Sequence, residues 1–171
     1  MILFGENRSI GALAATVLLA ANGCLYGFAG GGLPSHIRTV AILPFDNQTA
    51  EPSLTIEVAA AVTEAIERRL GLRLASEASA DAIVSGIITR YEADIPLQVL
   101  SDNLGNVAVT RRRVLISLSV EIFDVQEDRM LWQRSGLTVD GEYNPPREPE
   151  GREIALVKLV NDIVDGAQSQ W

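Results

Sequence analysis

The 171 residues carry a formal net charge of −8 and include only one cysteine and one histidine. This acidic balance argues against general nucleic-acid binding, which depends on neutralising phosphates. One cysteine excludes an internal disulfide and one histidine excludes a His-rich metal site, so a single domain of this length must be stabilised by its core alone.

Residues 1–23 are predicted to be a signal peptide. Their apolar core, residues 10–21, is too short to span a bilayer of roughly 30 Å, and small residues follow it. Cys24 comes directly after these small residues, so we expect it to carry a diacylglyceryl anchor. Ala21 and Asn22 depart from the usual lipoprotein signal, which has Leu and then Ala or Ser at these positions. The alternative is an ordinary signal peptide cleaved nearby, with Cys24 left as a free thiol.

Residues 24–38 are expected to form a tether between this anchor and a domain over residues 39–171. Three successive glycines, residues 30–32, lose much conformational entropy when they are ordered, which favours a flexible link. His36 lies near the end of the tether and is interpreted as a residue that leads into the first strand, not as a catalytic group. Removing 23 of the 171 residues leaves 148, which suits one domain.

The domain is predicted to begin with a buried strand and an amphipathic helix. Residues 39–45, TVAILPF, are apolar on both alternations, which predicts a strand covered on both faces. Residues 53–70 place apolar side chains at every fourth position and end before Gly71, a residue typical of helix C-termini. A strand over 81–92 is expected next, and an additional short strand over 72–75 is left open.

The second half is predicted to contain a hairpin and a closing helix. Pro96 and Gly105 interrupt the pattern over residues 95–106, which predicts a long loop. Residues 107–124 alternate between mainly apolar and mainly polar positions and are the clearest strand of the sequence. The later elements are a turn at 126–129, a partner strand at 130–139, an extended or looped proline-rich segment at 142–151 and a helix at 152–170.

These elements predict the fold class α+β: a two-layer sandwich in which a four-stranded mixed sheet carries two helices on one face. The order is strand-helix-strand-strand-strand-helix. The first strand-helix-strand passage should be a right-handed crossover, so at least one pair of strands is expected to be parallel.

No set of residues matches a catalytic arrangement, so an enzyme is not expected. A Ser-His-Asp arrangement would have to use His36, which lies beside the tether, and no G-x-S-x-G motif accompanies any serine. The glycines at 30–32 do not lie between a strand and a helix, so they do not form a phosphate-binding loop. Neither a cofactor nor a metal centre is expected.

The one basic cluster of the sequence is Arg111-Arg112-Arg113, at the start of the long strand. Alternation sends Arg111 and Arg113 to one face of that strand and Arg112 to the other. Guanidinium groups suit phosphates and carboxylates, so Arg111 and Arg113 are candidate binding residues. The alternative is that they are strand-end charges paired with nearby acids.

Three sequence segments and the predicted helix that follows them resemble a known family. In chain order the segments are LPSHIRTVAILPFDNQTAEPSL, RRRVLISLSVEIFDV and MLWQRSG. With this order and spacing, the chain after Cys24 resembles the LptE-like lipoproteins of lipopolysaccharide assembly over nearly its whole length. The piece VAILPFDNQT also occurs in other outer-membrane lipoproteins, so the full order is more telling than any one segment.

The resemblance implies a non-enzymatic outer-membrane lipoprotein. Members of this family sit in the lumen of the LptD β-barrel as a plug and assembly partner, and they assist lipopolysaccharide passage to the cell surface. Leu25 after Cys24 is compatible with sorting to the outer membrane. On this resemblance, Arg111 and Arg113 are candidate contacts for lipid A phosphates or for the barrel. The charge of −8 favours partnership with the barrel over direct lipopolysaccharide binding.

A second interpretation keeps the anchor and changes the role. The piece VAILPFDNQT with its following helix also resembles the periplasmic domains of CsgG-like secretion lipoproteins and of lipoprotein activators of penicillin-binding proteins. CsgG-like chains need added membrane-spanning hairpins, for which 148 residues leave little room. The activators usually carry a longer disordered tether than this sequence offers.

Overall fold

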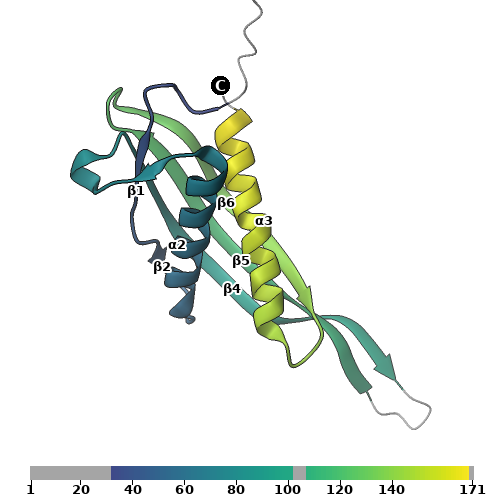
Figure 1. The fold of residues 1–171 in the computed structure, drawn as a ribbon. Coiled ribbons are helices and arrows are strands. Elements are labelled where there is room, and N and C mark those ends of the chain that lie inside the picture. Colours follow the sequence, from purple (N-terminus) through teal and green to yellow (C-terminus); the bar gives the residue numbers. More distant parts are fainter. Residues whose placement is uncertain (1–31, 102–106, 170–171) are drawn as a thin grey trace, which may run out of the picture. The chain divides into compact units, whose positions relative to one another are not determined.

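The computed structural model describes residues 32–101 and 107–169, so Cys24 and most of the predicted tether lie outside the described residues. In chain order the elements are β1 (Thr39–Ile42), β2 (Asp46–Asn47), α2 (Ser53–Ala65), a π-helical turn (Ile66–Leu70), β3 (Arg73–Leu74), a 3₁₀ turn (Glu77–Ser79), β4 (Ala82–Ser101), β5 (Val107–Asp124), β6 (Arg129–Tyr143) and α3 (Glu148–Ser169). The three long strands β4, β5 and β6 run side by side, with α2 and α3 packed across them (Figure 1).

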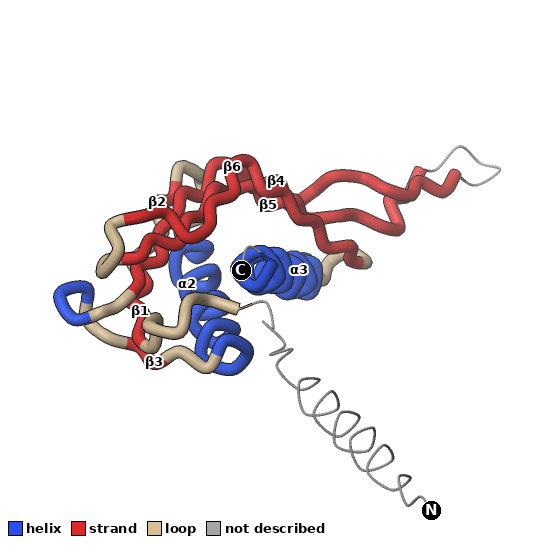
Figure 2. Tube along the Cα trace, turned by 90° about the horizontal axis from the view of Figure 1, so that it is seen from above, coloured by secondary structure: helices blue, strands red, loops and turns tan. Residues whose placement is uncertain are grey.

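The strands form one mixed sheet in the order β3-β1-β4-β5-β6, and β2 pairs with β4 further along that strand. β1 is parallel to β3 and to β4, and β2 is parallel to β4. β4, β5 and β6 follow one another as antiparallel neighbours. The expected parallel pair is therefore present, formed by β1 and β4 with α2 between them in the chain. Both helices lie on the same face of the sheet (Figure 2).

The predicted α+β class with a mixed sheet and two helices is confirmed, but the sheet has six strands rather than four. The extra strands, β2 and β3, are each two residues long. Asp46 and Asn47 favour turns in the sequence, yet their backbone pairs with Ile87 and Ile88 of β4. Neighbouring strands, rather than local preference, decide the conformation of these short pieces. β3 lies within residues 72–75, where the sequence left an additional short strand open.

The predicted loop over residues 95–106 is wrong for its first seven residues. β4 runs on to Ser101, and this part of it pairs with the first residues of β5. Pro96 is tolerated because the pairing shifts register on both sides of it, between Glu92 and Ile95 and between Pro96 and Gln98. A residue without an N–H fits where the ladder of hydrogen bonds is already interrupted. Residues 102–106 lie outside the described residues.

Of the extended or looped segment predicted over residues 142–151, only residues 144–147 form a loop, because β6 runs to Tyr143 and α3 begins at Glu148. Pro149 is compatible with the helix because it occupies the first turn, where the backbone N–H groups have no partner within the helix. β6 and α3 come into close contact at Gly141 of β6 and Gly151 of α3. A β-carbon at Gly141 would lie 1.8 Å from the carbonyl oxygen of Gly151, so only glycine fits this crossing.

The core lies between the sheet and the two helices. Alternate side chains of β5 point toward the helices and are buried, whereas their neighbours point toward the opposite, open face. Large side chains that are fully buried include Leu54, Val58 and Val62 of α2, Ile116, Leu118 and Ile122 of β5, and Leu159 and Ile163 of α3. Burial of each of these side chains contributes about 1.5–3 kcal/mol, so this core is a main source of the domain's stability.

Candidate functional site

Beyond the helices, β4 and β5 continue as a two-stranded ribbon made of residues 98–101 and 107–111 (Figure 1). β6 ends opposite Arg112, and β2 ends opposite Ile88, so neither strand reaches the ribbon. The sequence predicts a loop here because Pro96 dominates the local pattern. The signal that could have revealed the ribbon is the number of large apolar residues near Pro96, namely Ile95, Leu97, Val99 and Leu100.

The ribbon exposes apolar side chains on both of its faces. Val99 pairs with Val109, and Leu100 pairs with Ala108. Because successive side chains of a strand point to opposite faces, Val99 and Leu100 point away from each other, and they are 53% and 54% exposed. Val107 is 68% exposed. Exposed apolar groups gathered on one protruding element indicate an interaction surface.

The three arginines at the base of the ribbon differ in their contacts. Arg112 forms an ion pair with Asp94, and the hydroxyl of Tyr143 lies 2.9 Å from the same carboxylate. The hydrogen bond from Arg112 lowers the pKa of Asp94. Arg111 forms an ion pair with Glu142, whereas Arg113 has no ion pair within the described part of the chain. The Nε of Arg113 is buried and also lacks a hydrogen-bond partner there.

A cleft of about 360 Å³ opens beside Arg111, where the ribbon meets the start of α3. Its lining residues are Arg111, Glu142, Tyr143, Asn144 and Glu150. The structure thus brings the candidate Arg111 together with acids, as the pairing alternative predicts. Of the two candidates, Arg113 is the one whose charge has no local partner among the described residues.

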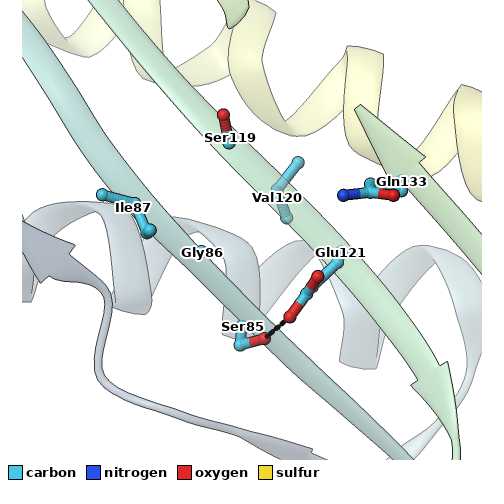
Figure 3. Close-up of a pocket in the computed structure, with 7 residues that line it drawn as sticks. All are labelled: Ser85, Gly86, Ile87, Ser119, Val120, Glu121 and Gln133. Atoms are coloured by element: carbon cyan, nitrogen blue, oxygen red, sulfur yellow. Dashed lines mark hydrogen bonds between the residues drawn. The ribbon is translucent and has the colours of Figure 1, made fainter. Parts of the chain in front are cut away.

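A second concavity, of about 220 Å³, lies on the open face of the sheet, with the helices behind the strands (Figure 3). Its lining residues are Ser85, Gly86, Ile87, Ser119, Val120, Glu121 and Gln133. The hydroxyl of Ser85 donates to Oε1 of Glu121 over 2.8 Å. This pair is a satisfied hydrogen bond without a histidine beside it, so the pocket offers a binding surface rather than an activated nucleophile.

His36 belongs to a partly buried polar cluster, centred on Asp124, that the sequence does not predict. Its Nε2 lies 2.7 Å from Oδ2 of Asp124, whose side chain is 0% exposed. Oδ1 of Asp124 accepts the backbone N–H groups of Gln126 and Glu127 at 2.9 and 3.0 Å. Burial by itself raises the pKa of Asp124, but these hydrogen bonds outweigh it and hold the pKa below its usual value.

The cluster escapes sequence analysis because 88 positions separate its two central residues. One local signal was available: Asp124 occupies the next inward position after Ile122, where alternation calls for an apolar side chain. An aspartate at such a position needs a hydrogen-bonding partner. Glu127 also faces the imidazole, and the ligand atoms of His36, Asp124 and Glu127 lie within 4.8 Å of one another. This group could hold a metal ion.

Neither α2 nor α3 is both long enough and apolar enough to cross a membrane. Cys24, the predicted site of lipid attachment, lies outside the described residues.

The fold and these surfaces define a two-layer α+β domain with a protruding apolar ribbon, an architecture suited to binding and assembly. A family model described as lipopolysaccharide-assembly, LptE, matches residues 37–167. This range includes the six strands of the described sheet, all of α2, and α3 except for its last two residues. The chain therefore belongs to the LptE family, which places it in lipopolysaccharide assembly.

Solved structures share this fold at low sequence identity. A protein from Xanthomonas campestris has a TM-score of 0.54 and 14% identity, and the match covers 78% of this chain and 87% of that one. The PelC dodecamer from Paraburkholderia phytofirmans has a TM-score of 0.53 and 14% identity, with 81% and 95% covered. The hypothetical protein CT253 from Chlamydia trachomatis has a TM-score of 0.50 and 16% identity, with 78% and 97% covered. At such identities the likeness concerns the fold alone.

A comparison with curated protein sequences gives no match.

Proposed function

We propose that this protein is a lipid-anchored outer-membrane lipoprotein that partners and plugs an LptD-type β-barrel, and so assists barrel assembly and lipopolysaccharide export. The observation that carries the proposal is the LptE family match over residues 37–167, which spans the whole architecture from β1 into the last turns of α3. The role is non-enzymatic: the barrel and the lipid are partners to be bound.

The ribbon supports a plugging role. Exposed apolar side chains lie on both of its faces, so a single flat surface could cover only one set of them. An element of this kind is best covered when a partner encloses it from both sides, as the lumen of a barrel would. The open face of the sheet, which no helix covers in Figure 2, adds a second surface for the barrel wall.

The lipid anchor at Cys24 is the proposed attachment to the outer membrane. The Cys24→Ala variant should lose acyl labelling and be released to the periplasm, because the thiol is the acceptor of the diacylglyceryl group. Labelling with radioactive palmitate followed by membrane fractionation measures both effects. Unchanged palmitate incorporation in the variant would rule out this anchor.

Arg111 and Arg113 are the proposed contacts for lipid A phosphates or for acidic groups of the barrel. Replacing both by Glu should weaken lipopolysaccharide binding by about tenfold or more, since charge-assisted hydrogen bonds contribute roughly 1.5–3 kcal/mol each. Arg73 and Arg134 are exposed arginines outside the ribbon, so their double Glu variant makes the same change in charge and serves as control. Equal binding by the two double variants would remove Arg111 and Arg113 from the site.

The partner is identified by affinity purification of the tagged protein from solubilised membranes. Recovery of a large LptD-type barrel in a stable complex supports the proposal. Recovery of a peptidoglycan synthase would replace it with the activator role, and a self-assembled ring would replace it with a CsgG-like secretion role. The barrel should also fail to reach the outer membrane when this protein is depleted.

A further inference from the structure

The cluster at His36 contains two hydrogen-bond acceptors that face each other. In the neutral tautomer whose Nε2–H donates to Oδ2 of Asp124, the imidazole of His36 carries its lone pair on Nδ1. That Nδ1 lies 3.8 Å from Oε1 of Glu127, which is also an acceptor. The repulsion between these two electron-rich atoms is relieved by a cation between them, which is either a proton on Nδ1 or a metal ion.

The side chains around this contact leave one oxygen of Glu127 facing the imidazole and open to solvent. Arg129 donates its Nε–H to Oε2 of Glu127 over 2.6 Å, so the other carboxylate oxygen is the one that faces the imidazole. The side chains of His36 and Glu127 are 27% and 49% exposed, which gives an ion access from solvent. Asp124 is 0% exposed and fixes the ring from behind.

This arrangement matches the carboxylate–histidine–metal pattern, in which a buried carboxylate orients the metal-bound imidazole through its other nitrogen. We propose that Nδ1 of His36 and Oε1 of Glu127 bind a divalent transition-metal cation such as Zn²⁺, with Asp124 as the orienting carboxylate and water completing the coordination. Imidazole and carboxylate together favour this class of metal over Mg²⁺ or Ca²⁺, which prefer oxygen ligands alone.

The spacing of the two ligand atoms fits this metal. With Zn–N and Zn–O bonds of about 2.0–2.2 Å, a separation of 3.8 Å gives an N–Zn–O angle of about 130°. A shift of about 0.4 Å in the half-exposed Glu127 side chain reaches the tetrahedral angle.

The bound cation would fasten the start of the domain to the turn between β5 and β6. Ile37, next to His36, is buried in the core, and Leu33 packs against it. The metal would therefore hold the segment that leads from the predicted tether into the domain. This inference does not depend on the proposed function.

The test is a Zn²⁺ titration of the purified full chain at neutral pH, carrying Cys24→Ser so that no thiol competes. Zn²⁺ in about 100-fold excess over its Kd should raise Tm by about 5–10 °C, because the metal binds only the folded cluster. Co²⁺ should give visible absorption bands. His36→Gln and Glu127→Gln should each abolish both signals, whereas Glu77→Gln, an exposed acid elsewhere, should keep them.

Three results would overturn the site. The first is an unchanged Tm with millimolar Zn²⁺. The second is a Zn²⁺-dependent rise of Tm that persists in both His36→Gln and Glu127→Gln. The third is a His36-dependent gain of stability on acidification without any response to Zn²⁺, since the cation between the two acceptors would then be a proton.

Discussion

Replacing Asp124 by Ala is expected to lower the free energy of unfolding by about 3 kcal/mol. The carboxylate is buried and accepts three hydrogen bonds, from the backbone N–H groups of Gln126 and Glu127 and from Nε2 of His36. Hydrogen bonds to a charged group contribute about 1.5–3 kcal/mol each. Gln126 and Glu127 are exposed, so water can rehydrate their N–H groups in the variant and the loss stays below the sum.

Urea unfolding followed by the fluorescence of Trp132, which is buried in the core, measures this loss. With an m-value of about 2 kcal/mol/M, the midpoint should fall by about 1.5 M while m stays constant. Asp124→Asn is the matched control, because its Oδ1 can still accept both backbone N–H groups and should lose about half as much. A loss below about 1 kcal/mol for Asp124→Ala, or equal midpoints for the two variants, would refute the reasoning.

Three further predictions concern other contacts. Gly141→Ala should lower the free energy of unfolding by about 3 kcal/mol or more, because the added β-carbon would meet the backbone of Gly151. Gly136→Ala should lower it by about 1 kcal/mol, because this glycine lies in open space at φ +66. Thermal unfolding compares the two variants. Hydrogen bonds from Thr39 and from the Arg38 backbone lower the pKa of Asp81 to about 2. The ionised carboxylate therefore contributes its full stabilisation when the pH is above 3.8, the ordinary pKa of the group. The free energy of unfolding should fall as the pH drops from 3.8 toward 2, and the urea midpoint should fall less over this range in Asp81→Asn. An equal or larger fall in the variant would show that Asp81 is not the group that titrates. Arg152→Met should cost about 2 kcal/mol in urea, because it leaves the partly exposed Glu57 and Glu148 without their cation, and no loss would show that the ion pairs contribute nothing.

Local pattern is enough to predict the elements whose periodicity is unbroken. β5 alternates over its inward positions from Val114 to Ile122, and α2 repeats apolar residues from Leu54 to Val62, so both are predicted close to their observed bounds. The mixed sheet follows from the order of these elements. Here the sequence pattern and the tertiary structure agree because each element buries one continuous face.

Prediction fails where a neighbouring strand overrides local preference. Pro96 predicts the end of a strand, yet β4 continues because β5 pairs with it and register shifts absorb the missing N–H. Asp46 is drawn into β2 by β4 in the same way. The His36–Asp124 pair depends on contacts between distant positions, which no local pattern encodes. The arginine candidates are intermediate: alternation predicts their faces, but only the structure shows that Arg111 is paired with Glu142.

The length of β5 sets how far the ribbon reaches. β1 begins beside the start of β4, and the last turns of α3 lie against Trp132 near the start of β6, so the described chain enters and leaves at the end opposite the ribbon (Figure 1). At about 3.3 Å per residue, the 18 residues of β5 extend up to about 60 Å from that end. A bilayer with its headgroups is about 40–45 Å thick. Under the proposed function, a domain tethered at the periplasmic side of the membrane is long enough to carry the ribbon through a surrounding barrel to the outer surface.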